Sequence, residues 1–227
     1  MIRLIKTSPP DALVLNGEAW TSTVLEKIAA GIDPTPTELS RYRIPAIKIA
    51  LLKETNGKCA YCESKFEHIA YGDVEHISPK SLDPARIFNW DNLTLACDVC
   101  NTNKGNNFPF GEGLIDPYVK TPSDHFRIVG PLIFGVPGDD DARLTELTLK
   151  LNRPALIERR QQKINYLREQ VEVIARAPAR LQSLLKENLQ AEILGDQEYS
   201  AIASEYLAPY IRHSPPPVSI ALGAAAP

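Results

Sequence analysis

The sequence predicts an α+β fold that is mainly helical, with a small central core between two helical arms. Apolar residues recur at helical spacing on both sides of the core, at Trp20, Val24 and Ile28 near the N-terminus and from Leu156 to Ile174 in the second half. This spacing is lost between residues 58 and 110, and all four cysteines of the chain fall there. The cysteine-rich stretch is therefore expected to fold as a unit of its own, with the helical arms flanking it.

The N-terminal arm is expected to span residues 1–57 and to contain two helices. The first covers Trp20–Ala30, and Gly31 is a stop signal directly after it. The second begins at Pro45, because proline suits the first position of a helix. Its end is expected just before Gly57, since glycine is favoured in the position that follows a helix.

Residues 111–151 are expected to form a mixed connecting segment. Gly and Pro punctuate this segment, and a short hairpin is expected around Phe126 to Phe134. The run GDDDAR at 138–143 is interpreted as a solvated acidic loop.

The C-terminal helical region is expected to cover residues 152–212. Asn152 and Pro154 predict the start of a long helix, because both residue types are favoured at helix N-termini. Two further helices are expected, over Leu181–Leu194 and Ser200–Ile211. The segment 213–227 is rich in Pro and Ala and is predicted to be a disordered tail.

The composition limits the classes of function. The 227 residues carry a formal charge of −3. Duplex nucleic acid is bound mainly through phosphate neutralisation by Lys and Arg, so this chain needs a local basic contact or a partner to hold DNA. The sequence contains no apolar run of about 18 residues, so no membrane span is expected. The first residues, MIRLIKTSPP, lack the apolar run of a signal peptide, so we expect a cytoplasmic protein.

The four cysteines form two C-x-x-C pairs, Cys59 with Cys62 and Cys97 with Cys100. Two residues between the ligands let a tight turn aim both thiolates at one ion, and two such pairs complete a tetrahedral zinc site. Thiols stay reduced in the cytoplasm, so zinc is favoured over disulfides. The alternatives are a pair of redox dithiols or four unrelated buried cysteines. Because protein would fill all four positions, the zinc is expected to be structural, and catalysis is expected from other residues.

A set of polar residues accompanies the cysteine pairs. Glu75 and His76 stand in VEHISPK, Asn92 in NWDNLTLA, and Asn101 directly after the last cysteine. This order resembles the HNH, or ββα-metal, nuclease family. There an acidic residue and a histidine end a first strand, an Asn precedes a short second strand, and a final His or Asn lies on a helix. The resemblance covers roughly residues 58–105, and it implies a ββα-metal core of the zinc-bearing branch.

The residue types suit hydrolysis of a phosphodiester. His76 is assigned as the general base, since a neutral imidazole near pH 7 can deprotonate water. Glu75 and Asn101 offer oxygen ligands to a hard divalent cation, Mg²⁺ or Mn²⁺. The resemblance implies that Asn92 holds the loop that aims His76. Consecutive strand residues point to opposite faces, so Glu75 and His76 can serve one site only where the strand ends, and Ser78 with Pro79 marks such an end.

Three further polar residues have more than one interpretation. Lys104 could contact a substrate phosphate, or it could cap the C-terminus of a short helix. Asp116, in LIDPYV, could approach the metal, but an aspartate before proline is by default a turn residue. His125 is expected to be a packed histidine rather than a catalytic one.

The flanking segments extend the resemblance over most of the chain. LIDPYVKTPSDHF (114–126) and LTLKLNRPALIERR (147–160) are similar to PtuB-like nucleases of bacterial anti-phage defence. These belong to Septu systems, including some attached to retrons. The resemblance implies a PtuA-like ATPase of the ABC type as partner. Where a retron is attached, it also implies a reverse transcriptase with its non-coding RNA and DNA.

The charge of the core agrees with a need for a partner. Between Lys58 and Phe110, five Lys and Arg stand against seven Asp and Glu, a net of 5 − 7 = −2. A nuclease module with this charge is expected to borrow affinity for double-stranded DNA from a partner. The helical arms, residues 1–57 and 152–212, are expected to dock that partner rather than nucleic acid.

Two other functions stay open. A stand-alone restriction-type HNH endonuclease would carry its own basic recognition surface, which the sequence does not reveal. A zinc-knuckle binding or scaffold protein would not need Glu75, His76, Asn92 and Asn101 intact. A redox protein using the two dithiols is a more distant alternative. Metal analysis discriminates it, because a redox protein would contain no stoichiometric zinc.

Overall fold

The computed structural model describes residues 1–66, 72–106 and 113–211. The expected disordered tail, 213–227, lies outside these residues. The described chain is mainly helical with two small sheets, as expected. Its helices and 3-10 turns are α1 (Asp11–Ala29), α2 (Pro36–Leu39), η1 (Arg41–Arg43), α3 (Pro45–Thr55), η2 (Pro84–Arg86), η3 (Trp90–Asn92), α4 (Asp98–Lys104), α5 (Pro122–His125), α6 (Asp140–Thr148), α7 (Pro154–Arg176), α8 (Ala179–Ala191) and α9 (Ser200–Ile211). Its strands are β1 (Asp73–His76), β2 (Leu93–Ala96), β3 (Phe126–Val129) and β4 (Leu132–Gly135).

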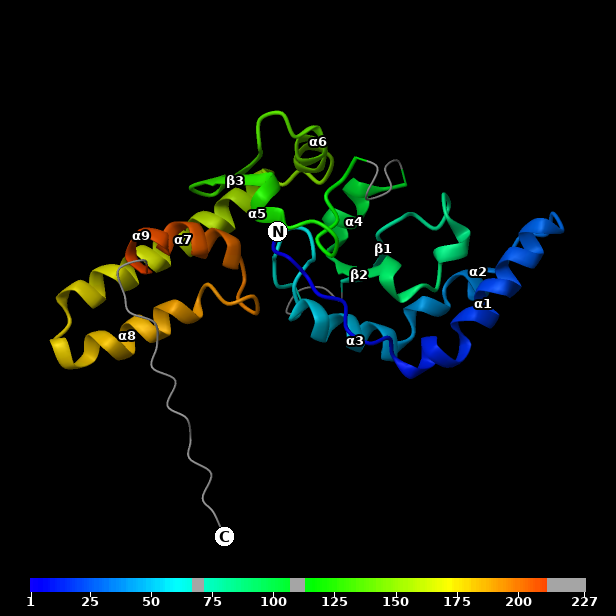
Figure 1. The fold of residues 1–227 in the computed structure, drawn as a ribbon, viewed down its shortest axis with the longest axis horizontal. Helices are drawn as coiled ribbons and strands as arrows, with labels where there is room; N and C mark the ends of the chain where they lie inside the picture. Colours follow the sequence, from blue (N-terminus) through cyan, green and yellow to red (C-terminus); the bar gives the residue numbers. More distant parts are fainter. Residues whose placement is uncertain (67–71, 107–112, 212–227) are drawn as a thin grey trace, which may run out of the picture.

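The centre of the molecule is a ββα unit. β1 and β2 pair antiparallel in a register that sets Glu75 opposite Thr94 and His76 opposite Leu93. α4 follows β2 after a single residue, Cys97. Figure 1 shows this unit between two helical ends, with α1 on one side and α7, α8 and α9 on the other. Within the described ranges, no helix combines the length and apolar character needed to cross a bilayer.

The N-terminal arm packs directly on the ββα unit. α1 begins at Asp11, earlier than the expected Trp20, because Pro10 precedes it in extended conformation and Asp11 suits the first turn. α3 spans Pro45–Thr55 as expected, and Asn56 and Gly57 both adopt the left-handed conformation that ends it. The buried face of α3, including Ile47 and Leu51, belongs to the same apolar core as β2.

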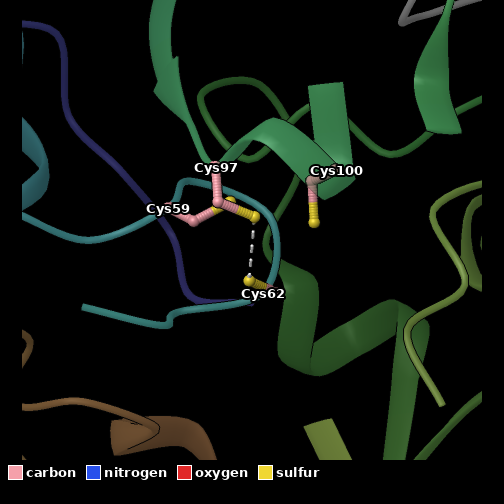
Figure 2. Close-up of side chains that lie close together, drawn as sticks. All are labelled: Cys59, Cys62, Cys97 and Cys100. Carbon is pink, nitrogen blue, oxygen red and sulfur yellow. Dashed lines mark hydrogen bonds between the residues drawn. The ribbon is translucent and has the colours of Figure 1, made fainter. Parts of the chain in front are cut away.

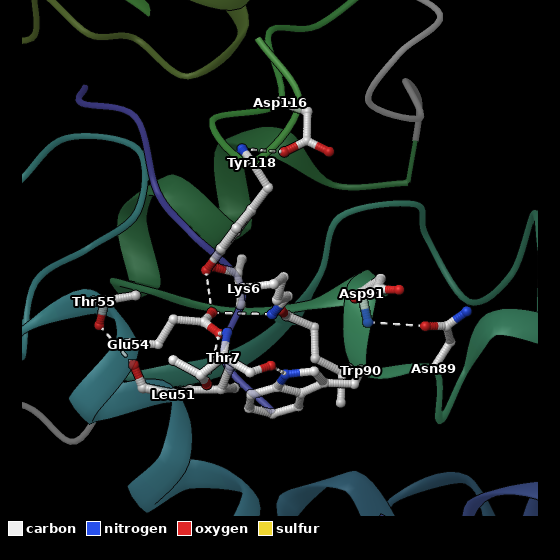
Figure 3. A network of polar contacts seen from close by, with 12 residues as sticks. Lys6, Thr7, Leu51, Glu54, Thr55, Asn89, Trp90, Asp91, Asp116 and Tyr118 are labelled. Carbon is white, nitrogen blue, oxygen red and sulfur yellow. Dashed lines mark hydrogen bonds and ion pairs between the residues drawn. The ribbon is translucent and has the colours of Figure 1, made fainter. Parts of the chain in front are cut away.

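A polar network ties three distant segments to β2 (Figure 3). Glu54 on α3 accepts hydrogen bonds from Lys6 Nζ at 3.0 Å and from the Tyr118 hydroxyl at 2.6 Å. The Tyr118 hydroxyl also lies 2.8 Å from Thr94 Oγ1 on β2. Lys6 Nζ further bonds the Leu93 carbonyl and lies 4.3 Å from the centre of the Trp90 ring. These contacts fix the position of β2, the strand that pairs with Glu75 and His76 of β1.

The connecting segment contains the expected hairpin, β3 with β4, but not the expected acidic loop. Residues 138–143 instead include the start of α6. Asp139 caps this helix, since its Oδ1 accepts from the Ala142 N–H at 2.9 Å. The aspartates that follow lie in the first helical turn, where negative charge is favourable. Gly and Asp are typical both of solvated loops and of helix N-termini, so the composition of residues 138–143 does not distinguish the two.

The C-terminal region forms three helices around a second, smaller apolar cluster. α7 begins at Pro154 as expected, but Asn152 does not cap it. Asn152 Oδ1 instead accepts from the Ile133 N–H at 2.9 Å, which binds the helix start to the hairpin. α8 and α9 match the two shorter helices that were expected. The apolar cluster between α7, α8 and α9 consists of Leu167, Ile174, Leu189, Ala203 and Leu207.

Candidate functional site

The four cysteines converge at one point, although 34 residues separate the two pairs (Figure 2). Their sulfur atoms all lie within 4.8 Å of one another, and Cys62 Sγ is 3.9 Å from Cys97 Sγ. Sulfurs at the corners of a tetrahedron around zinc, with bonds of about 2.3 Å, would lie about 3.8 Å apart. The sulfur separations and the four-thiol donor set thus fit zinc, and the cluster could hold this ion.

Each C-x-x-C pair is built into a different local structure. The first forms a tight turn in which the Glu63 N–H donates to the Cys59 carbonyl at 3.0 Å, with Glu63 left-handed at φ 66°. The second begins α4, because Cys97 is the residue before the helix and Cys100 lies in its first turn. A metal at the cysteines would therefore fix the start of the helix that carries Asn101 and Lys104.

A cation from the C-terminal region approaches this cluster. Arg153, the residue before α7, donates from Nη1 to Cys100 Sγ at 3.6 Å and from Nη2 to Cys97 Sγ at 3.9 Å. Four thiolates around a divalent ion carry a net negative charge, so a guanidinium at this distance stabilises them. The sequence motif did not indicate this contact, because Arg153 lies 53 residues beyond Cys100.

The structure brings Glu75, His76 and Asn101 to one cavity of about 170 Å³. β1 ends at His76, which explains how two consecutive residues of opposite strand faces line the same space. The cavity also contains Asp73, which sequence reasoning missed. Asp73 and Glu75 are two residues apart in one strand, so the period of the strand was the signal that could have found it.

Asp73 determines how Asn101 is oriented. Asn101 Nδ2 donates to Asp73 Oδ2 at 2.8 Å. A carboxylate accepts but does not donate, so this contact fixes which end of the amide faces Asp73 and leaves the amide oxygen turned away from it. The cavity wall formed by β1 and α4 therefore offers carboxylate and amide oxygens.

His76 is buried beside Tyr42, whose ring meets the imidazole edge-on with 4.4 Å between ring centres. Its Nε2 lies 2.9 Å from the Ile87 carbonyl oxygen. A carbonyl only accepts, so Nε2 carries the proton and Nδ1 of the neutral ring keeps the lone pair. Desolvation by burial, with smaller contributions from the charges of Lys80, Lys104 and Arg43, lowers the pKa of His76 to about 4. The imidazole is thus neutral at pH 7.

Asn92 ends η3, directly before β2, and is fully buried. Its side chain bridges the loop that follows His76. Its Oδ1 accepts from the Ser78 N–H at 2.7 Å, and its Nδ2 donates to the carbonyls of Ser78 at 3.0 Å and Arg86 at 3.1 Å. The Ile77 N–H also donates to the Asn92 carbonyl at 2.8 Å. Together these bonds fix the chain on both sides of the His76 loop.

Lys104 lines the same cavity and is paired there with Glu75. It is 1% exposed, and its Nζ lies 2.6 Å from Glu75 Oε1 and 2.8 Å from the His76 carbonyl oxygen. It therefore contacts β1 from the cavity, and a contact with a substrate phosphate stays a prediction. Burial raises the pKa of Glu75, and the charge of Lys104 opposes that shift.

Neither Asp116 nor His125 lines this cavity. Asp116 Oδ1 accepts from the Tyr118 N–H at 2.8 Å, so it serves its own turn, as the default interpretation predicted. His125 Nδ1 lies 2.6 Å from Asp139 Oδ2 at the start of α6. This histidine is half-buried and paired with an acid.

The ββα unit, its cysteine cluster and the His76 cavity define a nuclease-type domain, and comparison with protein families agrees. Residues 59–107 match the family model described as HNH endonuclease, so the chain contains an HNH endonuclease domain. Among curated relatives, the Septu protein PtuB of Bacillus thuringiensis is 44% identical over 85 residues, which cover 37% of this chain and 33% of the relative. The Septu protein PtuB of Bacillus mycoides (strain KBAB4) is 29% identical over 116 residues, which cover 38% of this chain and 39% of the relative. The chain thus spans well under half the length of these relatives.

Proposed function

We propose that the chain is a metal-dependent endonuclease that hydrolyses phosphodiester bonds of double-stranded DNA. The observation that carries this proposal is the shared cavity, in which a neutral, buried His76 lies beside the oxygen-rich wall of Asp73, Glu75 and Asn101. A base next to a set of hard oxygen ligands suits phosphodiester hydrolysis.

In this mechanism His76 takes a proton from the attacking water on Nδ1, while Nε2 keeps its own proton on the Ile87 carbonyl. The pKa of about 4 keeps the ring in its proton-accepting form at neutral pH. Asn92 acts as a positioning residue, because it holds the loop behind His76 without touching the reacting atoms. Tyr42 packs against the ring and limits its rotation.

Glu75 and Asn101 would hold the divalent cation, with Asp73 orienting the amide. Carboxylate and amide oxygens are the donors that Mg²⁺ and Mn²⁺ prefer, so the donor set fits. When bound, the cation would neutralise charge on the phosphate and orient it. Zinc at Cys59, Cys62, Cys97 and Cys100 would be structural, since protein fills all four positions.

We further propose that the chain is the nuclease subunit of a bacterial anti-phage complex in the cytoplasm. The similarity to Septu proteins PtuB supports this role. The partner would be a PtuA-like ATPase of the ABC type. In systems attached to a retron, the reverse transcriptase with its RNA and DNA would join them.

Exposed apolar side chains on both helical arms support a docking role for the arms. Val14 and Leu15 on α1 are 65% and 78% exposed, and Leu181 and Leu184 on α8 are 43% and 56% exposed. Helices that present apolar side chains to solvent commonly pack on a partner. The net charge of −3 supports borrowing affinity for DNA from that partner.

The activity is tested by a cleavage assay with Mg²⁺ or Mn²⁺ on duplex DNA, single-stranded DNA and RNA. The variant His76→Ala should lose on the order of a hundredfold or more in rate while keeping its zinc and its helix content. The matched control is His125→Gln, which changes a histidine outside the cavity and should cleave at the wild-type rate. Full activity in His76→Ala would remove His76 from the mechanism.

The partner role is tested by co-purification of the chain with the proteins encoded beside its gene. Leu184→Asp should reduce recovery of the ATPase, whereas Ser183→Asp, an exposed neighbour on the same helix, should not. Copurification that is equal for wild type and both variants would contradict docking through α8. Tight, sequence-specific DNA binding by the isolated chain at physiological salt would favour a stand-alone enzyme.

A further inference from the structure

The His76 cavity is completed by the N-terminal arm. The 3-10 turn η1 lies more than 30 residues before His76, yet its Tyr42 packs on the His76 ring and is itself 3% exposed. Tyr42 and Arg43 line the same cavity as His76 and Glu75. The arm is therefore part of the site as well as a flank of it.

Tyr42 brings two positive charges together at the cavity. Lys80 Nζ donates to the Tyr42 hydroxyl at 3.1 Å and lies 5.1 Å from the centre of its ring. The Arg43 guanidinium carbon lies 5.5 Å from the centre of the same ring. Cations at such distances from an aromatic ring are attracted to it. The ring thus holds both cations without neutralising either of them.

Arg43 and Lys80 have no acidic partner among the residues that the structure describes. Other cations near the core, including Lys6, Lys58 and Lys104, form ion pairs with acidic side chains. Among the ion pairs of the described residues, none involves Arg43 or Lys80. Arg43 is exposed and Lys80 half-exposed, so both can reach a ligand in solvent. The cavity consequently has an acidic wall, Asp73 and Glu75, and a basic wall.

We propose that Arg43 and Lys80, held on Tyr42, bind a backbone phosphate of the nucleic acid strand that enters the cavity. This assignment rests on the proposed nuclease function. A nucleic acid strand that lies against the acidic wall carries negative phosphates, which need positive charge nearby. Lys and Arg are the residues that neutralise phosphates. One turn of the N-terminal arm would then contact nucleic acid, while the other exposed faces of the arm stay available to a protein partner.

The test measures binding of a fluorescent DNA duplex by the full-length protein at several salt concentrations, with Ca²⁺ in place of Mg²⁺. Arg43→Gln and Lys80→Gln should each weaken binding by about tenfold and lower the salt slope by about 1, as expected when one phosphate contact is lost. Arg43→Lys should restore the slope because it restores the charge. In cleavage assays with Mg²⁺, the Gln variants should raise KM more than they lower kcat.

The matched control is Arg41→Gln. Arg41 lies on the same 3-10 turn and also packs over an aromatic ring, 5.8 Å from the centre of Trp20, but it does not line the cavity. This variant should bind and cleave like the wild type, and thermal melting of all variants reports whether η1 stays packed.

The outcomes separate the two levels of the proposal. Wild-type salt slopes in both Arg43→Gln and Lys80→Gln, with an active wild-type enzyme, would overturn the phosphate assignment alone. An equal loss of DNA affinity in Arg41→Gln would also overturn the assignment, because the effect would then follow from the net charge of the protein and not from the cavity. A wild-type protein that cleaves no nucleic acid, alone or with its partner, would overturn the nuclease function itself.

Discussion

Asn101 Nδ2 donates a 2.8 Å hydrogen bond to Asp73 Oδ2, and this contact joins the helix that follows the second cysteine pair to the strand that carries Glu75 and His76. The two residues are 28 positions apart in the sequence. The bond makes the orientation of the Asn101 amide depend on Asp73. Asp73 is thus a positioning residue in the proposed mechanism.

Loss of this contact should weaken the metal site. Asp73→Ala leaves the Asn101 amide free to rotate, so we expect cleavage to need about tenfold more Mg²⁺ and to slow at fixed Mg²⁺. A Mg²⁺ titration of the cleavage rate measures this. The control is Asp91→Asn, an exposed aspartate outside the cavity. A Mg²⁺ requirement unchanged in Asp73→Ala would exclude the positioning role.

The buried pair of Glu75 and Lys104 should matter to stability as well as activity. Glu75→Gln removes the carboxylate that Lys104 pairs with, and breaking a buried ion pair costs about 3–5 kcal/mol in the free energy of unfolding. The double variant Glu75→Gln with Lys104→Met removes both charges and should recover part of the lost thermal stability. It should remain slow in cleavage because the carboxylate is still missing. A double variant no more stable than Glu75→Gln in thermal melts would contradict this account.

The cysteine cluster should hold about one zinc ion per chain, and zinc should be required for the fold of the core. Cys97→Ser should release zinc and unfold the ββα unit, since binding energy at such small sites is folding energy. Elemental analysis and circular dichroism measure the two effects. Val99→Ser, at an exposed position of the same C-x-x-C turn, is the control and should keep its zinc. Wild-type zinc far below one ion per chain would show that the site is not a zinc site.

Arg153 should raise the affinity of the cysteine cluster for zinc. Arg153→Gln removes the cation beside Cys97 and Cys100, and loss of such a partner of metal ligands typically lowers metal affinity by about 10–100-fold. Competition with a coloured chelator measures the affinity without reference to catalysis. Arg159→Gln, at an exposed arginine on α7, should match the wild type. Equal zinc affinities in both variants would mean that Arg153 only packs against the cluster.

Several features could be predicted because they depend on short stretches of sequence. The C-x-x-C spacing predicted convergent thiols, since two residues between ligands are enough to form the turn. The resemblance carried by Glu75, His76, Asn92 and Asn101 implied a strand end, an Asn that supports the loop and a helix after the second pair. The hairpin and the helices α3, α7, α8 and α9 were predicted from turn residues and apolar spacing, which are also local properties.

The sequence by itself therefore determined that the four cysteines converge and that a central ββα unit carries Glu75, His76, Asn92 and Asn101. Only the tertiary structure decided that Lys104 is buried against Glu75, that Asp73 orients Asn101, and that Tyr42 packs on His76. The physical reason is that each of these contacts joins segments far apart in the chain. Apolar spacing indicates which face of a helix or strand is buried, but packing of the whole core decides which polar side chains then meet.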